Sequence, residues 1–304
     1  MTPTFTTGAD LFGSWFADVE RGEPPVRFKL SEPFTALDVR PGRLILFGGA
    51  PGGGKTAALV QVGIDLLRRN ETARLLVANV EMVPALLVER VVSRLAAVPL
   101  TAISDRALTP DQLARVRAAV GALEPLAGRL AFLHAPFALE HVATAETAFG
   151  ATVLALDYIQ RFTVGDAGKD RREQLETAAT VLRRFCDAGA AVLVASAVAR
   201  QKGPGGSTYT GLNLASFRGS SELEYGCDGA YLFTPGDGGQ ITLTCEKNRY
   251  GIVTDIVTRF DPTTQTFTSA PAGLDAFDGT APALTRGSKA KGGRRATLDA
   301  DGSE

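Results

Sequence analysis

Residues 44–60 read Leu-Ile-Leu-Phe-Gly-Gly-Ala-Pro-Gly-Gly-Gly-Lys-Thr-Ala-Ala-Leu-Val. An apolar run leads into a glycine-rich segment, and a second apolar run follows it, which predicts a buried strand, a tight turn and the start of a helix. Between Gly49 and Thr56 the residues fit the pattern G-x-x-x-x-G-K-[ST] of a phosphate-binding loop. In such a loop backbone N–H groups converge on one point, where the helix dipole adds partial positive charge. The stretch therefore predicts a site for the phosphates of a nucleotide.

ATP and Mg²⁺ are the cofactors that this loop implies. Lys55 can reach the β and γ phosphates, while the Thr56 hydroxyl is placed to ligate the magnesium ion. The alternative is a glycine-rich structural turn, but such a turn would rarely lie between a buried strand and a helix. The predicted cofactor-binding residues are Gly49, Ala50, Pro51, Gly52, Gly53, Gly54, Lys55, Thr56 and Ala57.

Two acids end apolar runs elsewhere in the chain. Hydrolysis of a triphosphate needs an acid that helps to hold magnesium and a carboxylate that orients water, both at the carboxyl ends of strands near the loop. The run 153–157 ends on Asp157, which suits the outer-shell magnesium partner, and the run 75–81 ends on Glu81, which suits the water-orienting role. A helix N-cap or a solvated strand end is the alternative for each.

Apolar runs of strand length alternate with helical patterns from Arg43 to about residue 196. This alternation predicts an α/β fold with a mainly parallel sheet covered by helices on both faces. The expected strands are 43–48, 74–80, 130–134, 152–157 and 190–196, and the expected helices are 55–69, 83–96, 110–123, 138–148 and 171–188.

The pattern changes after Phe217. Three further runs, 229–233, 240–246 and 253–260, are joined by short turns and predict an antiparallel extension of the sheet. We expect an N-terminal amphipathic helix and linker over 1–33, an ATPase domain over 34–270 and a disordered tail over 271–304. The helix, near 9–19, gathers Leu, Phe, Trp and Val on one face, which suits docking on its own domain or on a neighbouring copy.

Composition limits the class of protein. The chain has 304 residues, 45% of them hydrophobic, and a net charge of −1, which argues against bulk electrostatic coating of nucleic acid. No apolar stretch approaches the ~20 residues that span a bilayer, and no secretory signal is evident, so we expect a cytoplasmic protein without membrane contact. Cys186, Cys227 and Cys245 lie in apolar surroundings that favour structural burial.

Several markers in one order resemble a known family, the RecA-fold motor domain of DnaB-type replicative helicases, over about residues 34–267. The fold class would then be a RecA-like P-loop NTPase. The markers are Glu81-Met82 with Arg90, Asp157-Tyr158-Ile159-Gln160, Ser196 with Arg200, the segment from Phe217-Arg218 to Asp228, and Lys247-Asn248-Arg249-Tyr250-Gly251.

The resemblance implies a ring, usually a hexamer, that surrounds single-stranded DNA and holds ATP between neighbouring subunits. Lys247 and Arg249 would enter the next subunit's site and stabilise charge on the γ phosphate, as an arginine finger does. A Lys-x-Arg pair on a strand also points both cations to the same side. A solvated strand edge is the alternative for this pair.

Two loops would face the channel of that ring. Cations there would attract the DNA backbone without reading bases, although plain solvated loops are the alternative. The candidate DNA-binding residues are Arg161, Lys169, Arg171, Arg172, Arg200 and Lys202.

The chain departs from the family pattern at three points. Ala197 stands where the family usually has a glutamine that links the γ phosphate to the DNA loop, and Ala50 replaces a common arginine. We also expect no helical N-terminal domain for primase contact. That layout resembles stand-alone motors of plasmid or phage replication modules, whose partner would be a loader or initiator protein. Ala197 and the near-neutral charge keep an assembly or loading ATPase without unwinding activity as an alternative to the helicase. The segment 247–251 also resembles the signature of RadA-type recombination ATPases, which is a second alternative.

Overall fold

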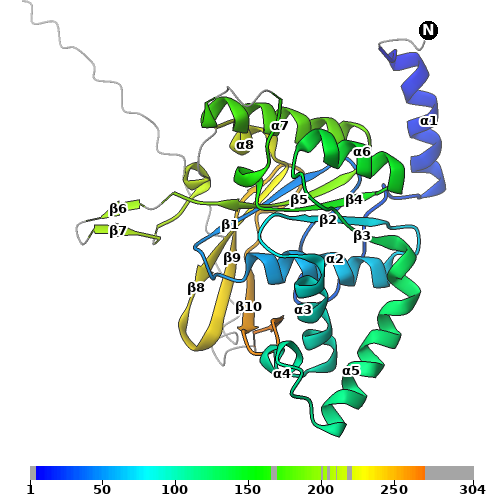
Figure 1. Cartoon of the computed structure of the whole chain (residues 1–304). Coiled ribbons are helices and arrows are strands. Elements are labelled where there is room, and N and C mark those ends of the chain that lie inside the picture. The colour runs from blue at the N-terminus through cyan, green and yellow to red at the C-terminus, as the bar shows by residue number, and fades with distance from the viewer. Residues whose placement is uncertain are drawn as a thin grey trace, which may run out of the picture. The chain divides into compact units, whose positions relative to one another are not determined.

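The computed structural model describes residues 5–165, 170–199, 201–203, 206–209, 211–217 and 221–270. A nine-stranded sheet in the order β11-β10-β9-β8-β1-β5-β4-β2-β3 forms its centre (Figure 1). The sequence prediction of a mainly parallel sheet with an antiparallel extension is confirmed. The tail expected to be disordered, 271–304, lies outside the described residues.

Six neighbouring strands of this sheet run parallel. β1, β2, β4 and β5 consist mostly of apolar residues and are almost wholly buried, as strands covered on both faces require. β1 lies between β5 and β8 in the middle of the sheet. The loop that follows it therefore starts from a strand that is hydrogen-bonded to a neighbour on each side. The parallel strands are β1 (Leu44–Gly49), β2 (Leu75–Asn79), β3 (Leu130–Phe132), β4 (Val153–Asp157), β5 (Ala191–Ala197) and β8 (Gly229–Pro235).

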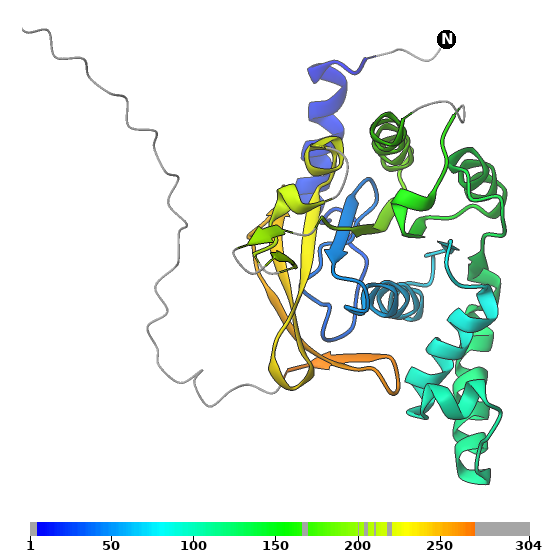
Figure 2. The ribbon, with the colours of Figure 1, turned by 60° about the vertical axis from the view of Figure 1, so that its left-hand side comes forward.

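Three antiparallel strands extend the sheet beyond β8, namely β9 (Gln240–Asn248), β10 (Ile256–Asp261) and β11 (Thr266–Ser269). The last of these was not expected from the sequence. Gln61 fixes it to α2, because its buried side-chain amide donates to the Phe267 carbonyl and accepts from the Phe267 N–H, both at 2.9 Å. Figure 2 shows the hairpin of β10 and β11, in orange, reaching toward α2.

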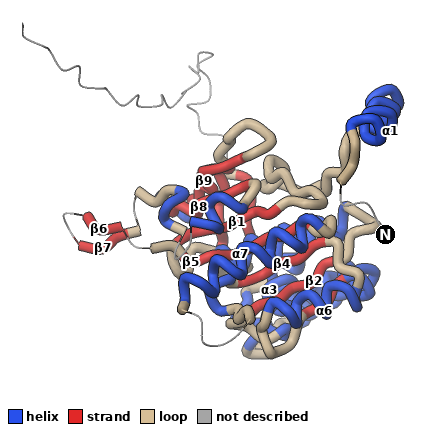
Figure 3. The backbone as a smooth tube through the Cα atoms, turned by 90° about the horizontal axis from the view of Figure 1, so that it is seen from above, coloured by secondary structure: helices blue, strands red, loops and turns tan. Residues whose placement is uncertain are grey.

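Helices cover both faces of the sheet. α2 (Lys55–Arg69) and α3 (Pro84–Ala96) lie on one face, with α4 (Leu100–Ser104) and α5 (Pro110–Leu123) packed against α3 (Figure 1). α6 (Leu139–Phe149), α7 (Arg171–Asp187) and α8 (Ser221–Gly226) lie on the other face, where Figure 3 shows α6 and α7 lying over the strands. Each face therefore has its own apolar core. Outside the main sheet, β6 (Gln201–Gly203) and β7 (Gly206–Thr208) pair only with each other.

A buried ion pair joins the two helices that flank the predicted nucleotide site. Two nitrogens of the Arg94 guanidinium lie 3.0 and 3.3 Å from the Asp65 carboxylate, and both side chains are at most 10% exposed. α2 follows the phosphate-binding loop and α3 follows Glu81. The pair therefore fixes the spacing between these two parts of the site.

The first helix, α1 (Gly8–Arg21), begins with a capping box between Thr7 and Asp10, as its sequence favours. Its large apolar side chains are between 53% and 68% exposed, and no residue of the helix is buried. Docking of this face on a neighbouring copy stays a prediction. The exposed apolar residues are Leu11, Phe12, Trp15, Phe16 and Val19.

Among the residues described, no helix combines the length and hydrophobicity that a bilayer crossing needs. The three cysteines are buried and unpaired in disulfides, as expected for structural residues.

Candidate nucleotide site

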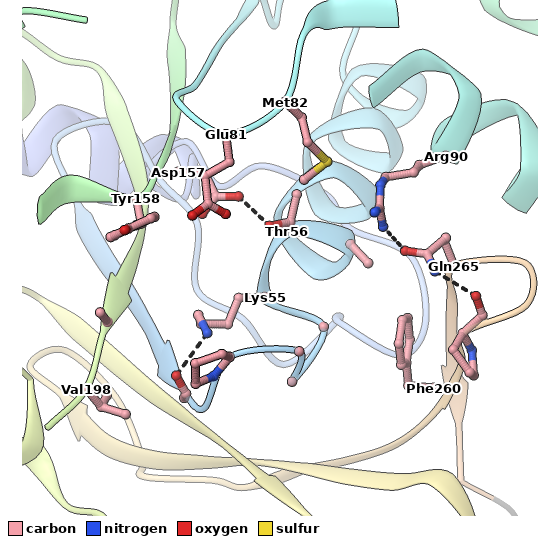
Figure 4. A pocket seen from close by; sticks show the side chains of 18 of the residues that line it. Lys55, Thr56, Glu81, Met82, Arg90, Asp157, Tyr158, Val198, Phe260 and Gln265 are labelled. Atoms are coloured by element: carbon pink, nitrogen blue, oxygen red, sulfur yellow. Dashed lines mark hydrogen bonds between the residues drawn. The ribbon is translucent and has the colours of Figure 1, made fainter. Parts of the chain in front are cut away.

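A cavity of about 530 Å³ opens at the carboxyl ends of the parallel strands (Figure 4). It is lined by the predicted loop residues except Ala50, and by both predicted acids, Glu81 and Asp157. Three strand ends thus bring together residues that are far apart in the sequence. The volume lies in the range of small-molecule sites.

The loop depends on glycine at two places. Gly52 and Gly54 have φ angles of 76° and 81°, which residues other than glycine rarely adopt. A Cβ atom on Gly54 would also lie 2.7 Å from the ring of Phe267 on β11. The loop conformation is therefore fixed both by backbone freedom and by close packing against the last described strand.

Lys55 begins α2 and lies over the loop. Its Nζ donates to the carbonyls of Gly49 at 2.9 Å and Ala50 at 2.8 Å. Burial lowers the pKa of this lysine, and the nearby charges of Asp157 and Glu81 partly oppose that effect. An ammonium group held in this position, with little water around it, suits an anionic ligand.

Asp157 ends β4 and contacts the loop directly. The Thr56 hydroxyl donates to its carboxylate at 2.5 Å. Burial raises the pKa of Asp157, while the hydrogen bond from Thr56 and the charge of Lys55 act in the opposite direction. This carboxylate is therefore held in a site that disfavours its charge, as expected where a cation is to be bound.

Asn79 organises both acids and was missed by the sequence reasoning. It ends β2 opposite Asp157 in the register of β2 and β4 and donates to that carboxylate at 2.9 Å. Its Oδ1 accepts from the backbone N–H groups of Glu81 at 2.9 Å and Met82 at 2.7 Å. The only signal in the sequence was a polar residue at the end of an apolar strand.

Glu81 lies just beyond β2, and its side chain is exposed at the cavity (Figure 4). A carboxylate in that position can accept a hydrogen bond from a water molecule in the cavity.

The far wall of the cavity comes from α3 and from the β10–β11 hairpin. Arg90 donates to the side-chain carbonyl of Gln265, whose amide nitrogen donates to the Pro262 carbonyl at 2.6 Å. The ring of Phe260 lines the cavity beside them (Figure 4). The sequence indicates Arg90 only through the family resemblance, and no local pattern indicates the hairpin residues.

At the end of β5 the position of the missing family glutamine is occupied by Ala197, which lines the cavity. Gln160, in the 3-10 turn that follows β4, accepts from the Ala197 N–H at 3.0 Å. Its amide nitrogen donates to the Ser196 hydroxyl at 2.8 Å. The carboxyl ends of β4 and β5 are therefore joined by a side chain, without a glutamine at position 197.

Lys247 and Arg249, on and just after β9, are not among the residues that line the cavity of their own chain. Lys247 donates to backbone carbonyls at the end of α8, and Arg249 contacts Asp228. The cations that do line the cavity, within the described part of the chain, are Lys55 and Arg90.

The candidate DNA-binding residues are only partly described. Arg161 is exposed at the end of a 3-10 turn, Ile159–Arg161. Arg172 is also exposed and pairs with Glu176 on α7 at 2.8 Å. Arg171 begins α7 and Lys202 lies in β6, but their side chains are outside the described structure, as are Lys169 and Arg200 altogether.

Comparisons with known proteins agree with this geometry. Residues 34–269 match the family described as DnaB-like helicase C terminal domain. Among solved structures, the chain resembles one described as an ATPase domain, with a TM-score of 0.75, 14% identity and coverage of 88% of this chain and 99% of that one. It also resembles "The Structure Of A DnaB-Like Replicative Helicase And Its Interactions With Primase", with a TM-score of 0.76, 14% identity and coverage of 87% and 68%. No curated protein matches the sequence.

Proposed function

The chain belongs to the family of DnaB-like helicase C-terminal domains, and from this premise we propose that it is a ring-forming, ATP-driven translocase on single-stranded DNA. In this proposal ATP is hydrolysed at the interfaces between subunits, as part of DNA replication. The observation that carries it is the convergence of the phosphate-binding loop, Glu81 and Asp157 on one cavity.

The lining residues fit ATP with Mg²⁺. Lys55 and the loop N–H groups would hold the phosphates, and Thr56, backed by Asp157 through the 2.5 Å hydrogen bond, would hold the metal ion. A magnesium ion held there would neutralise charge on the β and γ phosphates. Glu81 would orient the attacking water, because its carboxylate is exposed in the cavity while Asn79 fixes its backbone.

Replacing Asp157 by asparagine tests the metal assignment. We expect the unliganded Asp157→Asn variant to melt at or above the wild-type temperature at neutral pH, because burial opposes the charge that the substitution removes. The folded-state pKa of Asp157 lies above its unfolded value, so its stabilising contribution is present at low pH and is lost as pH rises through the folded value. The stabilisation that Mg²⁺ and ATP give to the wild type should be largely lost. Thermal melts with and without both ligands measure this.

The matched control is Asp65→Asn, which neutralises another buried carboxylate on the same core. It leaves Arg94 unpaired, so stability should fall by about 3–5 kcal/mol. An Asp157→Asn variant that keeps the full response to Mg²⁺ and ATP would contradict the role of this residue.

A complete site would need a second subunit. Lys247 and Arg249 lie outside the cavity of their own chain, which supports a role for both cations in the site of a neighbour. Six copies arranged head to tail would form six such sites, following the family. The apolar face of α1 would then be available for contact between copies.

Single-stranded DNA is the proposed polymer substrate. Arg161 and Arg172 are exposed, and a few cations per subunit, repeated around a ring, make a positive channel. The overall charge of −1 favours such local contact over general coating of nucleic acid.

Stimulation of ATP turnover by DNA tests this proposal against the loading-factor alternative. We expect single-stranded DNA to raise ATPase activity, and added salt to reduce the stimulation steeply, because contacts to phosphates release counterions. Double-stranded DNA of equal length serves as the control polymer. Turnover that is unchanged by DNA at every salt concentration would favour a nucleotide-dependent assembly factor.

A further inference from the structure

Both proposed trans-acting cations are held by carbonyl groups at the end of α8. The Nζ of Lys247 donates to the carbonyls of Glu224 at 2.7 Å and Tyr225 at 3.0 Å. Arg249 donates from Nη2 to the Tyr225 carbonyl at 2.9 Å. The two side chains therefore share one platform on their own subunit.

Asp228 holds Arg249 from the buried side. Its side chain is 1% exposed, and one carboxylate oxygen accepts from Nη1 of Arg249 at 3.1 Å. The other oxygen accepts from Nη1 of Arg183 at 2.8 Å and from the Leu44 N–H at 3.0 Å. The Arg249 N–H also donates to the Asp228 carbonyl at 2.8 Å, so side chain and backbone of Arg249 are fixed by the same residue.

The held guanidinium still presents an accessible side. The Arg249 side chain is 43% exposed, in contrast to Asp228 beneath it. A guanidinium has five N–H donors, and the contacts to Asp228 and Tyr225 use one on each terminal nitrogen. Arg249 can therefore stay bound to its own subunit and still donate to a phosphate outside it.

From this geometry we infer that Asp228 is a positioning residue for Arg249. It holds the guanidinium in the orientation in which it meets the γ phosphate in the neighbouring subunit. Donors that are already oriented cost little reorganisation when charge develops in the reaction. The inference rests on the proposed function, because it requires that Arg249 act on a neighbour's nucleotide.

Arg183 completes the arrangement. Burial opposes its charge, but hydrogen bonds to Asp228 and Asp187 outweigh that effect and raise its pKa. With Asp228 neutralised, Arg183 and Arg249 would face each other without the carboxylate between them, and repulsion would move the more exposed Arg249.

The experiment compares Asp228→Asn with the wild type in steady-state ATP hydrolysis by the assembled protein. We expect nucleotide affinity to change by less than about twofold and kcat to fall by about 10- to 100-fold. A misoriented Arg249 would slow the hydrolysis step without weakening the binding of ATP. The control is Asp187→Asn, which removes the other, 65% exposed, carboxylate partner of Arg183 and should leave kcat unchanged. A wild-type kcat in Asp228→Asn, or an equal loss of affinity and kcat, would overturn the inference.

The double variant Asp228→Asn with Arg249→Ala separates positioning from general damage. If Asp228 acts through Arg249, the double variant has the kcat of Arg249→Ala alone, whereas multiplied effects would contradict the inference. If Asp228→Asn does not fold, Asp228→Glu keeps the charge but moves the carboxylate, and the same selective loss of kcat is expected. Full activity in Arg249→Ala would reject the proposed function itself, while a defect in Arg249→Ala with normal Asp228→Asn rejects only this inference.

Discussion

Replacing Lys55 by alanine is expected to abolish ATP binding at the concentrations that saturate the wild type. Lys55 is the one loop residue with a cationic side chain, and its ammonium group is held over the loop by the Gly49 and Ala50 carbonyls. Removing one partner of a desolvated charge pair costs about 2–5 kcal/mol, which corresponds to roughly 30- to 5,000-fold in affinity. Fluorescent nucleotide titration or calorimetry measures the change.

Arg68→Ala is the matched control for this variant. It removes an exposed cation from the last turn of the same helix, far along α2 from the loop, and should leave ATP affinity unchanged. Because Lys55 also contacts loop carbonyls, a thermal melt must establish that the alanine variant is folded. Retention of wild-type affinity in folded Lys55→Ala protein would refute the nucleotide assignment.

Replacing Arg249 by alanine is expected to have the opposite profile, with ATP binding nearly intact and turnover lost. An arginine that acts from a neighbouring subunit contributes mainly in the transition state, by about 10³-fold or more in kcat. The position of Arg249 supports this expectation, because the residue does not line the cavity of its own chain. Binding titration combined with steady-state ATPase assays separates the two effects.

Arg259→Ala, an exposed arginine on the neighbouring strand β10, provides the control for charge and position in the sheet. The mass of the assembled particle should be measured for both variants, so that a lost ring is not mistaken for lost chemistry. Equal losses of binding and turnover in Arg249→Ala would argue that this residue supports its own subunit instead.

The sequence predicted those elements whose ends are set by residues close to them in the chain. Helix 55–69 has the predicted bounds, because the phosphate-binding motif sets its start and Asn70 ends it. The helix at 110–123 also has the predicted bounds, because Thr109 and Gln112 form a capping box at its start. Glu81 and Asp157 meet at one cavity because parallel strands place their carboxyl ends along one edge of the sheet.

The remaining parts depend on contacts between distant segments. β11 has only four residues, which is too short to show a periodicity in the sequence. It is held in place by the hydrogen bonds of Gln61 and by the stacking of Phe267 on Phe260. The contact of Arg90 with Gln265 and the link from Gln160 to Ser196 are of the same kind. No spacing rule predicts which side chains will cross from one strand end to the next.

The hairpin of β10 and β11 is synthesised long after the phosphate-binding loop. Gln61 can form its hydrogen bonds to Phe267 only after a further 206 residues have been translated. Ribosomes add about 5–20 residues per second, so roughly 10–40 s pass before that partner is made. Until then the wall that the β10–β11 hairpin contributes to the nucleotide cavity is missing. ATP should therefore bind tightly only after Phe267 has been made and packed against α2.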